Sequence, residues 1–418
     1  MRTRLPPAEA LRVVLETTPV LGSETVPLRA ALGRVLAESV AASRDLPPVD
    51  NSAMDGYAVR REDVSTASAA RPVALRVAFE LAAGASAEGA VAAGQAARVL
   101  TGAPIPPGAD AVVRQEDTER DGDRLSVRVA PAPREHIRDA GEDVRAGEEV
   151  LVAGAVVGPA QVGMLAALGR SLVAVHQRPR VAILSGGDEL VEPDGAISGG
   201  RIVSSNSYSL AAQCQELGAE PVYLGIARDT PEDLERRFRA GLGAHVLVSS
   251  AGVSVGDRDY VRAVLEKLGC ELLFWGVEMK PGFPLAFGRF AGAGGALVFG
   301  LPGNPVSAMV SFEQFARPAL RKMAGRRRWF RPTLQAVVAE RLAKKPGRLH
   351  FVRVELERCD GRVIARSTGS QSSGVLRSMT GARGLLVFPA EATELREGDT
   401  ATVQVLDPDF FASGDPGF

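Results

Sequence analysis

Apolar runs and amphipathic stretches alternate regularly between residues 179 and 325 of the chain. The apolar runs, which predict buried strands, lie at 181–184, 221–226, 245–250, 272–275 and 296–299. The helical patterns lie at 207–217, from Thr230 onward, before Leu268 and after Pro305. This alternation predicts a doubly wound α/β domain, in which helices cover both faces of a parallel sheet. Ligands of such sheets bind at the carboxyl ends of the strands.

The flanking regions show a shorter, β-type pattern instead. The strands predicted on the two sides lie at 72–80, 96–100, 110–114, 124–130, 333–341, 349–357, 362–367, 384–388 and 400–405. Asp121-Gly122 and Asp360-Gly361 are typical hairpin turns. The first 16 residues predict a turn followed by an amphipathic helix. We therefore expect an α/β core with β-rich modules before and after it.

The composition favours a core of small aliphatic side chains, because 45% of the 418 residues are hydrophobic but only 5% are aromatic. The 45 glycines and 27 prolines indicate many tight turns. The 49 basic and 50 acidic residues balance, which argues against a polyelectrolyte partner. One basic and aromatic run, 321–332, is compatible with nucleic-acid binding or with a helix end followed by a linker. We favour the linker, because no other basic surplus accompanies this run.

Cysteine and histidine are too scattered for a site that binds a soft metal. These residues are Cys214, Cys270, Cys359, His136, His176, His245 and His350. Without a CxxC, HxxxH or HExxH pattern, the chain lacks the signatures of a zinc site, an iron–sulfur cluster or a disulfide scaffold. A protein-bound metal would then have oxygen ligands, which suits Mg²⁺.

One uncharged run, 150–169, has the length of a membrane span. Gly154, Gly158, Pro159 and Gly163 interrupt it, so a strand, a turn and a helix fit better. The N-terminus also lacks the continuous apolar core of a signal peptide. We therefore expect a soluble cytoplasmic protein with no membrane and no nucleic-acid partner.

Three glycine-rich turns follow predicted strands at the same edge of the α/β sheet. They are SGGDEL (185–190), SSAGVSVGDRDY (249–260) and GLPGNP (300–305). Glycine permits close approach of the backbone to a ligand, and successive N–H groups form an anion nest. Asp257 and Asp259 fit beside a phosphate when a divalent cation bridges them. Each turn alone is compatible with a helix cap or a rigid loop, but together they predict a site for a phosphorylated ligand and a hard cation.

Four more segments have a composition that suits a shaped loop. They are PPVDNSAMDGYAVR (47–60), TGAPIPPGADAVV (101–113), MKPGFPLAFG (279–288) and GSQSSG (369–374). Lys280 follows a predicted strand and lies at the same edge as the glycine-rich turns, where it is available to an anion. The hydroxyl-rich segment GSQSSG suits either anion binding or a loop tip.

In combination these motifs resemble the molybdopterin molybdenumtransferase family, which includes MoeA and the E domain of gephyrin and its plant homologues. DNSAMDGYAVR, TGAPIPPGADAVV, SGGDEL, SAGVSVGDRDY, MKPGFP and GLPGNPVSA occur in the family's order over nearly the whole chain. The resemblance implies the final step of molybdenum cofactor biosynthesis. In that step adenylylated molybdopterin and molybdate bind, Mg²⁺ assists cleavage of the phosphoanhydride, molybdenum enters the dithiolene, and AMP leaves.

The resemblance also implies a homodimer and a set of domains. The active cleft is expected between the α/β domain of one subunit and the N-terminal β domain of the other. The adenylyltransferase and molybdoenzyme apoproteins are expected as transient partners. The implied segments are an N-terminal helix at 1–26, a linker or dimerisation module at 27–45 and 142–177, an inserted β-rich domain at 46–141, an α/β molybdopterin-binding catalytic domain at 178–328, and a C-terminal β-barrel-like domain at 329–412.

Site residues are carried over from the family's motifs position by position. The catalytic positions are expected to be Asp55, Thr101, Glu189, Asp229, Asp259 and Lys280, with Glu189 and Asp259 holding Mg²⁺. The substrate-binding positions are expected to be Asp143, Ser185, Gly186, Gly187, Asp188, Gly252, Ser254, Gly256, Asp257, Pro302, Gly303, Asn304, Pro305 and Ser373. Lys280 and the turn amides would bind anionic oxygens, and Asp55 and Thr101 would reach the reacting groups across the dimer.

Two positions depart from the family's usual pattern, since Gly276 and Phe283 stand where members commonly carry lysine. On sequence grounds, the arginines expected to replace these cations are Arg258, Arg262 and Arg289. The missing lysines keep two alternatives open, a molybdopterin-binding scaffold or carrier without turnover and a diverged paralogue that inserts molybdate inefficiently. A molybdopterin adenylyltransferase is a further alternative, against which the additional β modules argue.

Overall fold

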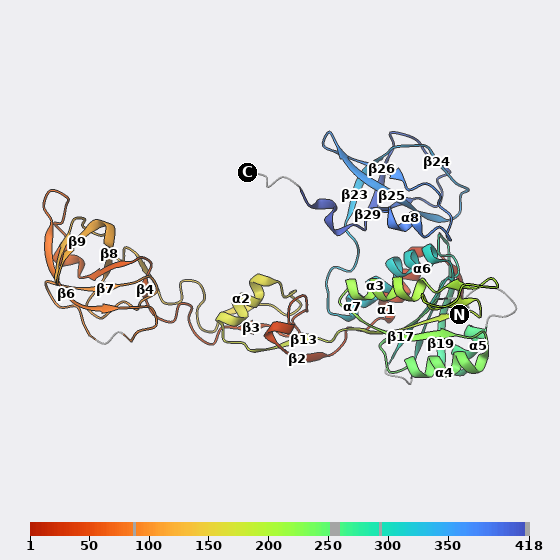
Figure 1. Cartoon of the computed structure of the whole chain (residues 1–418), viewed down its shortest axis with the longest axis horizontal. Helices are drawn as coiled ribbons and strands as arrows, with labels where there is room; N and C mark the ends of the chain where they lie inside the picture. The colour runs from red at the N-terminus through yellow and green to blue at the C-terminus, as the bar shows by residue number, and fades with distance from the viewer. Residues whose placement is uncertain (87–88, 251–259, 292–294, 414–418) are drawn as a thin grey trace. The chain divides into compact units, whose positions relative to one another are not determined.

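The computed structural model describes residues 1–86, 89–250, 260–291 and 295–413, and the chain divides into two compact units (Figure 1). Unit 1 comprises Met1–Glu24, Gly33–Ala37 and the chain from Ala174 onward, and unit 2 comprises Thr25–Leu32 and Glu38–Val173. Unit 1 is therefore discontinuous in sequence, and it contains both the α/β region and the C-terminal strands.

A seven-stranded sheet with helices on both faces forms the α/β region of unit 1 (Figure 1). In pairing order its strands are β1 (Arg2–Leu5), β19 (Cys270–Val277), β21 (Ala286–Phe290), β22 (Leu297–Leu301), β18 (Val246–Ser250), β14 (Arg180–Gly186) and β17 (Glu220–Ala227). One face packs against α1 (Pro7–Thr17), α3 (Asn206–Glu216), α6 (Pro305–Ser311) and α7 (Arg317–Met323), and the other against α4 (Pro231–Gly241) and α5 (Tyr260–Lys267). The predicted doubly wound α/β architecture is confirmed.

Local signals in the sequence explain where these helices begin and end. Thr230 caps α4 by accepting a hydrogen bond from the backbone nitrogen of Asp233 at 3.4 Å, and Pro231 occupies the first helical position. Gly218 follows α3 with a φ of +76°, a conformation that glycine adopts without strain. The rings of Phe274, Phe287 and Phe299 stack in series beneath the first layer of helices, with centroids 5.5 and 4.9 Å apart. Three of the chain's few aromatic residues thus lie together in this core.

Two details of the sheet differ from the sequence-based expectation. The sheet is mixed rather than parallel, because β21 runs antiparallel to both β19 and β22. The described residues of the connections on either side of β21 form no helix, and a parallel neighbour would require a longer crossover. Arg2–Leu5 forms the edge strand β1, parallel to β19, instead of the predicted turn.

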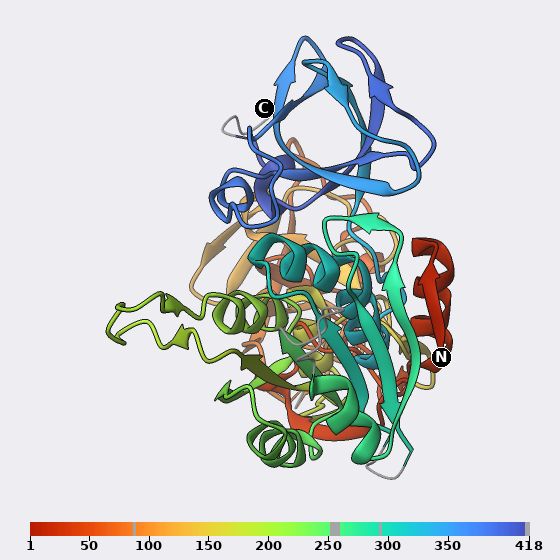
Figure 2. The same cartoon turned by 90° about the vertical axis from the view of Figure 1, so that its right-hand side faces the viewer.

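The C-terminal strands of unit 1 close into a five-stranded barrel (Figure 2). Around the barrel the strands are β25 (Leu349–Cys359), β26 (Arg362–Ser367), β23 (Thr333–Val338), β29 (Thr400–Val405) and β27 (Gly384–Phe388), and pairing of β27 with β25 closes it. Smaller elements of this region are β24 (Leu342–Ala343), β28 (Glu394–Leu395) and α8 (Arg377–Thr380). The short strand β20 (Met279–Lys280), which follows β19, pairs with β25 and so joins the α/β region to the barrel.

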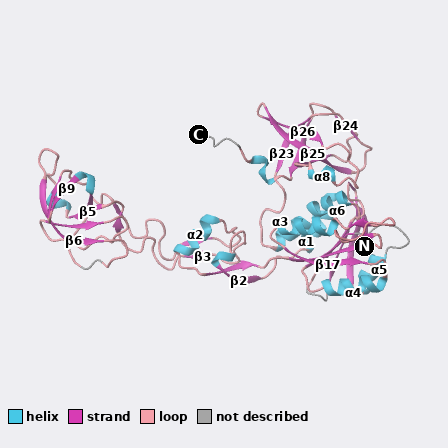
Figure 3. Ribbon diagram, viewed as in Figure 1, coloured by secondary structure: helices cyan, strands magenta, loops and turns pink. Residues whose placement is uncertain are grey.

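Unit 2 consists mainly of strands (Figure 3). Its six-stranded sheet has the order β8 (Ala111–Arg114), β5 (Gly56–Val59), β7 (Gln95–Val99), β6 (Val73–Leu81), β10 (Arg124–Val127) and β9 (Thr118–Asp121). Its other elements are β3 (Val40–Ala41), β4 (Asn51–Ser52), β11 (Ile137–Arg138), β12 (Glu149–Leu151) and α2 (Pro159–Ala167). The strands β2 (Ser23–Pro27) and β13 (Leu172–His176) contain the boundaries between the units. None of the described helices is long and apolar enough to cross a membrane.

Candidate functional site

The carboxyl ends of β14, β18 and β22, which are parallel and adjacent, lie at one edge of the sheet as predicted. A pocket of about 440 Å³, here called the polar pocket, lies at this edge. Seven of the predicted site residues line it, namely Ser185, Gly186, Glu189, Pro302, Gly303, Asn304 and Pro305. Glu189 is the one charged residue among its described lining residues. The SGGDEL and GLPGNP turns thus meet at a common cavity.

Buried hydroxyl groups form part of this edge, and the sequence analysis did not single out all of them. The Ser185 hydroxyl lies 2.6 Å from the Ser207 hydroxyl and 2.9 Å from the Ser250 hydroxyl. Ser204 extends the cluster, 3.3 Å from Ser207. The sequence pattern that could have indicated these hydroxyl groups is the run SSNSYS at 204–209, which places them at the start of α3.

Asn206 contributes an oxygen that is available to a ligand. Its Nδ2 donates to the Gly303 carbonyl at 2.7 Å, which ties the start of α3 to the GLPGNP turn. Its Oδ1 is buried and has no hydrogen-bond partner among the described residues. Because an unpaired buried carbonyl oxygen is costly, a donor group in the polar pocket would be bound favourably here.

The SGGDEL turn is shaped by contacts that only glycine permits. Gly187 has a φ of +145°, and a Cβ atom there would lie 2.6 Å from Glu189 Oε2. Asp188 and Asp229 accept hydrogen bonds from each other's backbone nitrogens at 3.3 and 3.4 Å. These bonds join Asp229, in the loop after β17, to the turn after β14. Three carboxylates therefore lie on two adjoining loops at the carboxyl end of the sheet.

These carboxylates are hard oxygen donors, the kind that Mg²⁺ prefers. Within the described ranges, no group of three or more His, Cys, Asp or Glu side chains is arranged to hold a metal ion by itself. Glu189 can supply one carboxylate ligand from the polar pocket. The predicted second ligand, Asp259, lies outside the described residues, as do Gly252, Ser254, Gly256 and Asp257.

Lys280 lines a second pocket of about 710 Å³, here called the cationic pocket, between the segment around β20 and the barrel. Its charged lining residues are Lys280, Lys344, Lys345, Arg348, Arg353 and a single acid, Glu278. Burial, together with the charges of Lys280, Lys344 and Arg348, lowers the pKa of His350 in this pocket to about 4. His350 is therefore neutral near pH 7, and the net positive charge of the pocket suits an anion.

Arg353 organises the loop that contains the predicted residue Ser373. Arg353 is 1% exposed, and its guanidinium donates to the Ser378 hydroxyl and the Ser372 carbonyl at 3.2 Å each. Burial lowers its pKa to about 10, which leaves it protonated near pH 7. The Ser373 carbonyl in turn accepts a hydrogen bond from the Val306 backbone nitrogen at 3.1 Å, at the start of α6. The loop 369–374 thus contacts elements of both pockets.

The two pockets share the loop 279–284. Lys280 and Pro281 line the cationic pocket, whereas Pro284 lines the polar pocket. Gly282 permits the close packing of this loop, because a Cβ atom there would lie 2.2 Å from Met279 Cε and 2.5 Å from Ser311 Oγ. The arrangement can hold a large polar ligand and a small anion on two sides of one loop.

Two of the arginines expected to replace the missing lysines are engaged elsewhere. Arg262 pairs with Glu266 at 3.0 Å, and Arg289 pairs with Glu271 at 2.8 Å. Neither lines the polar or the cationic pocket. Arg258 lies outside the described residues. Apart from Lys280, the cations of the cationic pocket come instead from the segment 344–353, where no site residue was predicted from the sequence.

Asp55, Thr101 and Asp143 belong to unit 2. The Asp55 carboxylate accepts hydrogen bonds from the Thr101 backbone nitrogen and hydroxyl, and these bonds hold the pKa of Asp55 below its usual value. Asp55 is exposed, so its ionised carboxylate is accessible to a ligand. Asp143 is also exposed, and its backbone nitrogen donates to the Leu46 carbonyl at 3.0 Å.

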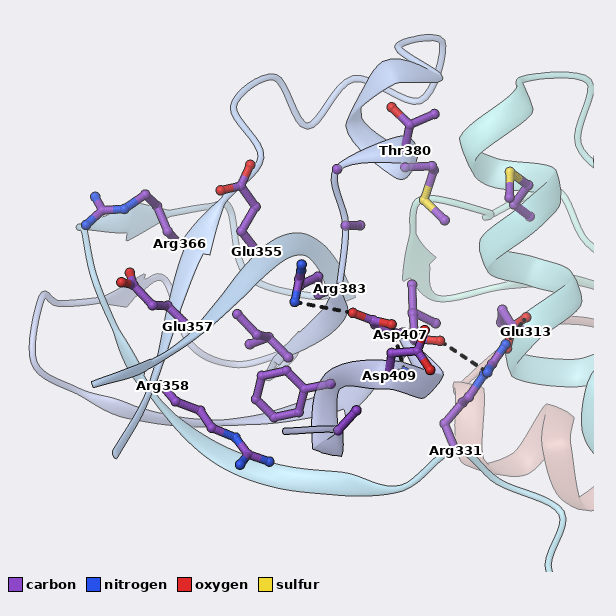
Figure 4. Close-up of a pocket in the computed structure, with 18 of the residues that line it drawn as sticks. Glu313, Arg331, Glu355, Glu357, Arg358, Arg366, Thr380, Arg383, Asp407 and Asp409 are labelled. Carbon is purple, nitrogen blue, oxygen red and sulfur yellow. Dashed lines mark hydrogen bonds and ion pairs between the residues drawn. The ribbon is translucent and has the colours of Figure 1, made fainter. Parts of the chain in front are cut away.

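A larger cavity, of about 1080 Å³, lies between α3, the turn after α6 and the barrel (Figure 4). None of the predicted site residues that the structure describes lines it. Some of its charged side chains are paired with each other, as Arg383 with Asp407 at 3.4 Å and Arg331 with Glu313 at 3.0 Å. We therefore assign the candidate site to the polar and cationic pockets rather than to this cavity.

Three family profiles match this chain. They are described as the MoeA N-terminal region (domain I and II) at residues 5–169, a probable molybdopterin binding domain at 182–322, and the MoeA C-terminal region (domain IV) at 335–406. Together they cover most of the chain, in the order in which the sequence motifs were recognised.

Curated relatives and solved structures agree with these profiles. The chain is 39% identical to a molybdopterin molybdenumtransferase of Nostoc sp., over 95% of this chain and 93% of the relative. It is 40% identical to molybdopterin molybdenumtransferase 2 of Mycobacterium tuberculosis, over 93% of this chain and 96% of that relative. A molybdopterin biosynthesis MoeA protein of Pyrococcus horikoshii has a similar crystal structure, with a TM-score of 0.84, 32% identity, and coverage of 96% of this chain and 99% of that chain.

Proposed function

Because this chain belongs to the molybdopterin molybdenumtransferase family, we propose that it inserts molybdenum from molybdate into adenylylated molybdopterin and releases AMP. This reaction is the final step of molybdenum cofactor biosynthesis. The observation that carries the proposal is the pair of pockets on the two sides of the loop 279–284. Among the described lining residues, one pocket is polar with Glu189 as its single charged side chain, and the other has five basic residues and one acidic residue.

The polar pocket suits the pterin nucleotide. Its lining is rich in hydroxyl and amide groups, and the unpaired Asn206 Oδ1 is an acceptor for an amino or N–H group of the ligand. The N-terminus of α3 lines the same pocket, and its field favours a phosphate group. We assign Ser185, Gly186 and the GLPGNP turn to binding of this substrate, as the family resemblance implies.

The cationic pocket suits molybdate, which is a tetrahedral dianion. Lys280 and Arg353 come from its two walls, one from the strand β20 and one from the barrel strand β25. Each cation near the anion contributes about 1 kcal/mol or more, even at a high effective dielectric constant. Because the loop 279–284 separates the pockets by a few residues, an oxyanion held by Lys280 lies next to the substrate of the polar pocket.

We propose Mg²⁺ as the metal that assists the reaction, held by Glu189 and Asp259. When bound, it would offset negative charge on the phosphoanhydride oxygens. The chain's own groups would hold both substrates in place, and Lys280 would stabilise the charge that develops as the anhydride is cleaved. Asp55, kept ionised by Thr101, would come from a second copy of the chain in a homodimer.

The test is turnover by the full chain with adenylylated molybdopterin, Mg²⁺ and molybdate, followed through AMP and active cofactor. We expect AMP to appear only when molybdate is present. Asp55→Asn and Asp259→Asn should abolish this release while folding is retained, whereas Asp360→Asn, in an exposed hairpin turn of the barrel, should behave as wild type.

The other outcomes each identify a different function. Substrate binding without AMP would indicate a carrier or scaffold, and AMP formation that ignores molybdate would contradict insertion. Formation of adenylylated molybdopterin from molybdopterin and ATP would indicate an adenylyltransferase. Wild-type rates in both the Asp55 and Asp259 variants would overturn the assignment of these residues.

A further inference from the structure

The ring of Phe283, in the loop between the two pockets, lies close to two arginine side chains. The Cζ atom of Arg348 is 4.3 Å from the ring centroid, and the Cζ atom of Arg4 is 5.6 Å from it. Both distances fall within the range of about 6 Å at which a guanidinium is attracted to an aromatic face. Phe283 is only partly buried, so it forms a platform for these cations rather than part of the core.

Gly276 lies beside this platform. A Cβ atom at Gly276 would lie 3.6 Å from Phe283 Cζ and 3.6 Å from the Arg4 backbone nitrogen. Gly276 also has a φ of +87°, which a larger residue would adopt only with strain. The two positions that depart from lysine are therefore close to each other, since a side chain at Gly276 would touch the ring of Phe283.

Glu278 sets the orientation of the guanidinium on this platform. Arg348 Nε donates a hydrogen bond to Glu278 Oε2 at 3.2 Å. Across the described part of the chain, Nε is the only guanidinium nitrogen of Arg348 with a hydrogen bond, which leaves both Nη groups for a ligand. Arg348 lines the cationic pocket, and its side chain is 41% exposed.

We infer that Phe283 is a positioning residue that holds Arg348 ready to bind the oxyanion in the cationic pocket. The inference rests on the proposed function, because it deepens the same site. A guanidinium that is stacked on one face and fixed at Nε presents two parallel N–H groups, which match two oxygens of a tetrahedral dianion. A lysine ammonium lacks this fork. The chain would thus use a stacked arginine where a lysine would act as a point charge.

The experiment measures binding of molybdate alone to the full chain by titration calorimetry. In Arg348→Gln we expect the dissociation constant to rise about tenfold, the effect of one charge-assisted contact. Arg348→Lys should bind molybdate more tightly than Arg348→Gln does. On a logarithmic scale, however, its dissociation constant should lie closer to that of Arg348→Gln than to that of wild type, because lysine lacks the two parallel N–H groups. Phe283→Leu should weaken binding severalfold although it removes no charge, whereas Phe283→Tyr, which keeps the ring, should bind as wild type does.

The control is Arg341→Gln, which removes a barrel arginine that pairs with Glu394 outside the pocket. It should leave the dissociation constant unchanged. In turnover, Phe283→Leu should raise KM for molybdate with kcat unchanged, a split that a general loss of folding would not produce.

Two results would overturn the inference while the proposed function stands. If wild type binds molybdate and Arg348→Gln binds equally well, Arg348 does not contact the anion. If Phe283→Leu binds as wild type does while Arg348→Gln is weak, the ring does not position the arginine. Failure of the wild-type chain to bind molybdate or to release AMP would instead contradict the proposed function itself.

Discussion

The carboxylate of Asp55 accepts two hydrogen bonds from Thr101, one from the backbone nitrogen at 2.7 Å and one from the hydroxyl at 2.8 Å. Both reach the same oxygen, Oδ1, although the residues are far apart in sequence. Hydrogen bonds to a carboxylate favour its ionised form and therefore lower its pKa. The pair accounts for two predicted site residues as one structural element, in which Thr101 orients Asp55 and stabilises its ionised form.

Replacing Thr101 should raise the pKa of Asp55. In Thr101→Val the hydroxyl bond is lost while the backbone bond remains, so we expect a partial return toward the ordinary value of 3.8. A carboxyl ¹³C titration by NMR measures this change. Thr380→Val is the matched control, because its hydroxyl likewise donates to a backbone carbonyl, that of Arg377, and belongs to the other unit of the chain. An Asp55 titration that is identical in wild type and Thr101→Val would contradict the role assigned to the hydroxyl.

His350 should make the stability of the chain depend on pH. Its pKa is about 4 in the folded state, whereas an unfolded histidine titrates near 6.5. The unfolded state therefore binds more protons between these values, and stability should fall as the pH is lowered from about 6.5 to about 4. Urea unfolding of wild type and His350→Gln at pH 7 and pH 5 measures this contribution. The variant should lose less stability on acidification, and equal losses would show that His350 is not the group responsible.

Gly282 should be intolerant of a side chain for two separable reasons. Its φ of +110° disfavours alanine by about 1–2 kcal/mol. The new Cβ atom would also collide with Met279 and Ser311, which adds about 1–3 kcal/mol of overpacking. Gly347→Ala isolates the first effect, because Gly347 has a φ of +102° but open space around it. Denaturant unfolding should show a larger loss for Gly282→Ala, and equal losses would mean that the loop relaxes around the methyl group.

The parts of the fold that the sequence predicted depend on local chemistry. The DG hairpin at Asp360 and Gly361 is confirmed by their φ values of +49° and +73°. The strands and helices of the α/β region follow from runs of apolar residues with clear caps. The meeting of two glycine-rich turns at one sheet edge followed from the general geometry of parallel strands.

The parts that the sequence did not predict depend on pairing between distant segments. The edge strand β1 exists because Thr3 pairs with Trp275, and the four residues of β1 have no distinctive pattern of their own. The cationic pocket forms because Lys280 in β20 pairs with His350 in β25. The cations of this pocket come from separate segments of the sequence, so no single motif predicts the site. The proximity of Gly276 and Phe283 was likewise not predicted, because each position stood out in the sequence only by the absence of a lysine.

Glu313 should be a major determinant of stability, because it neutralises buried arginines between the α/β region and the barrel. Its side chain is 4% exposed, accepts hydrogen bonds from Arg331 at 3.0 Å and from Gln213 at 2.9 Å, and lies 3.7 Å from Arg317. Glu313→Gln keeps the size but leaves the arginines with Glu216, which is half exposed. Breaking a buried pair in this way costs about 3 kcal/mol or more, whereas an exposed pair contributes about 1 kcal/mol or less.

Glu394→Gln, which removes the partner of the exposed Arg341, is the matched control. Chemical denaturation should show a large loss for the first variant and a small one for the second, and losses of similar size would refute the stabilising role of the buried carboxylate.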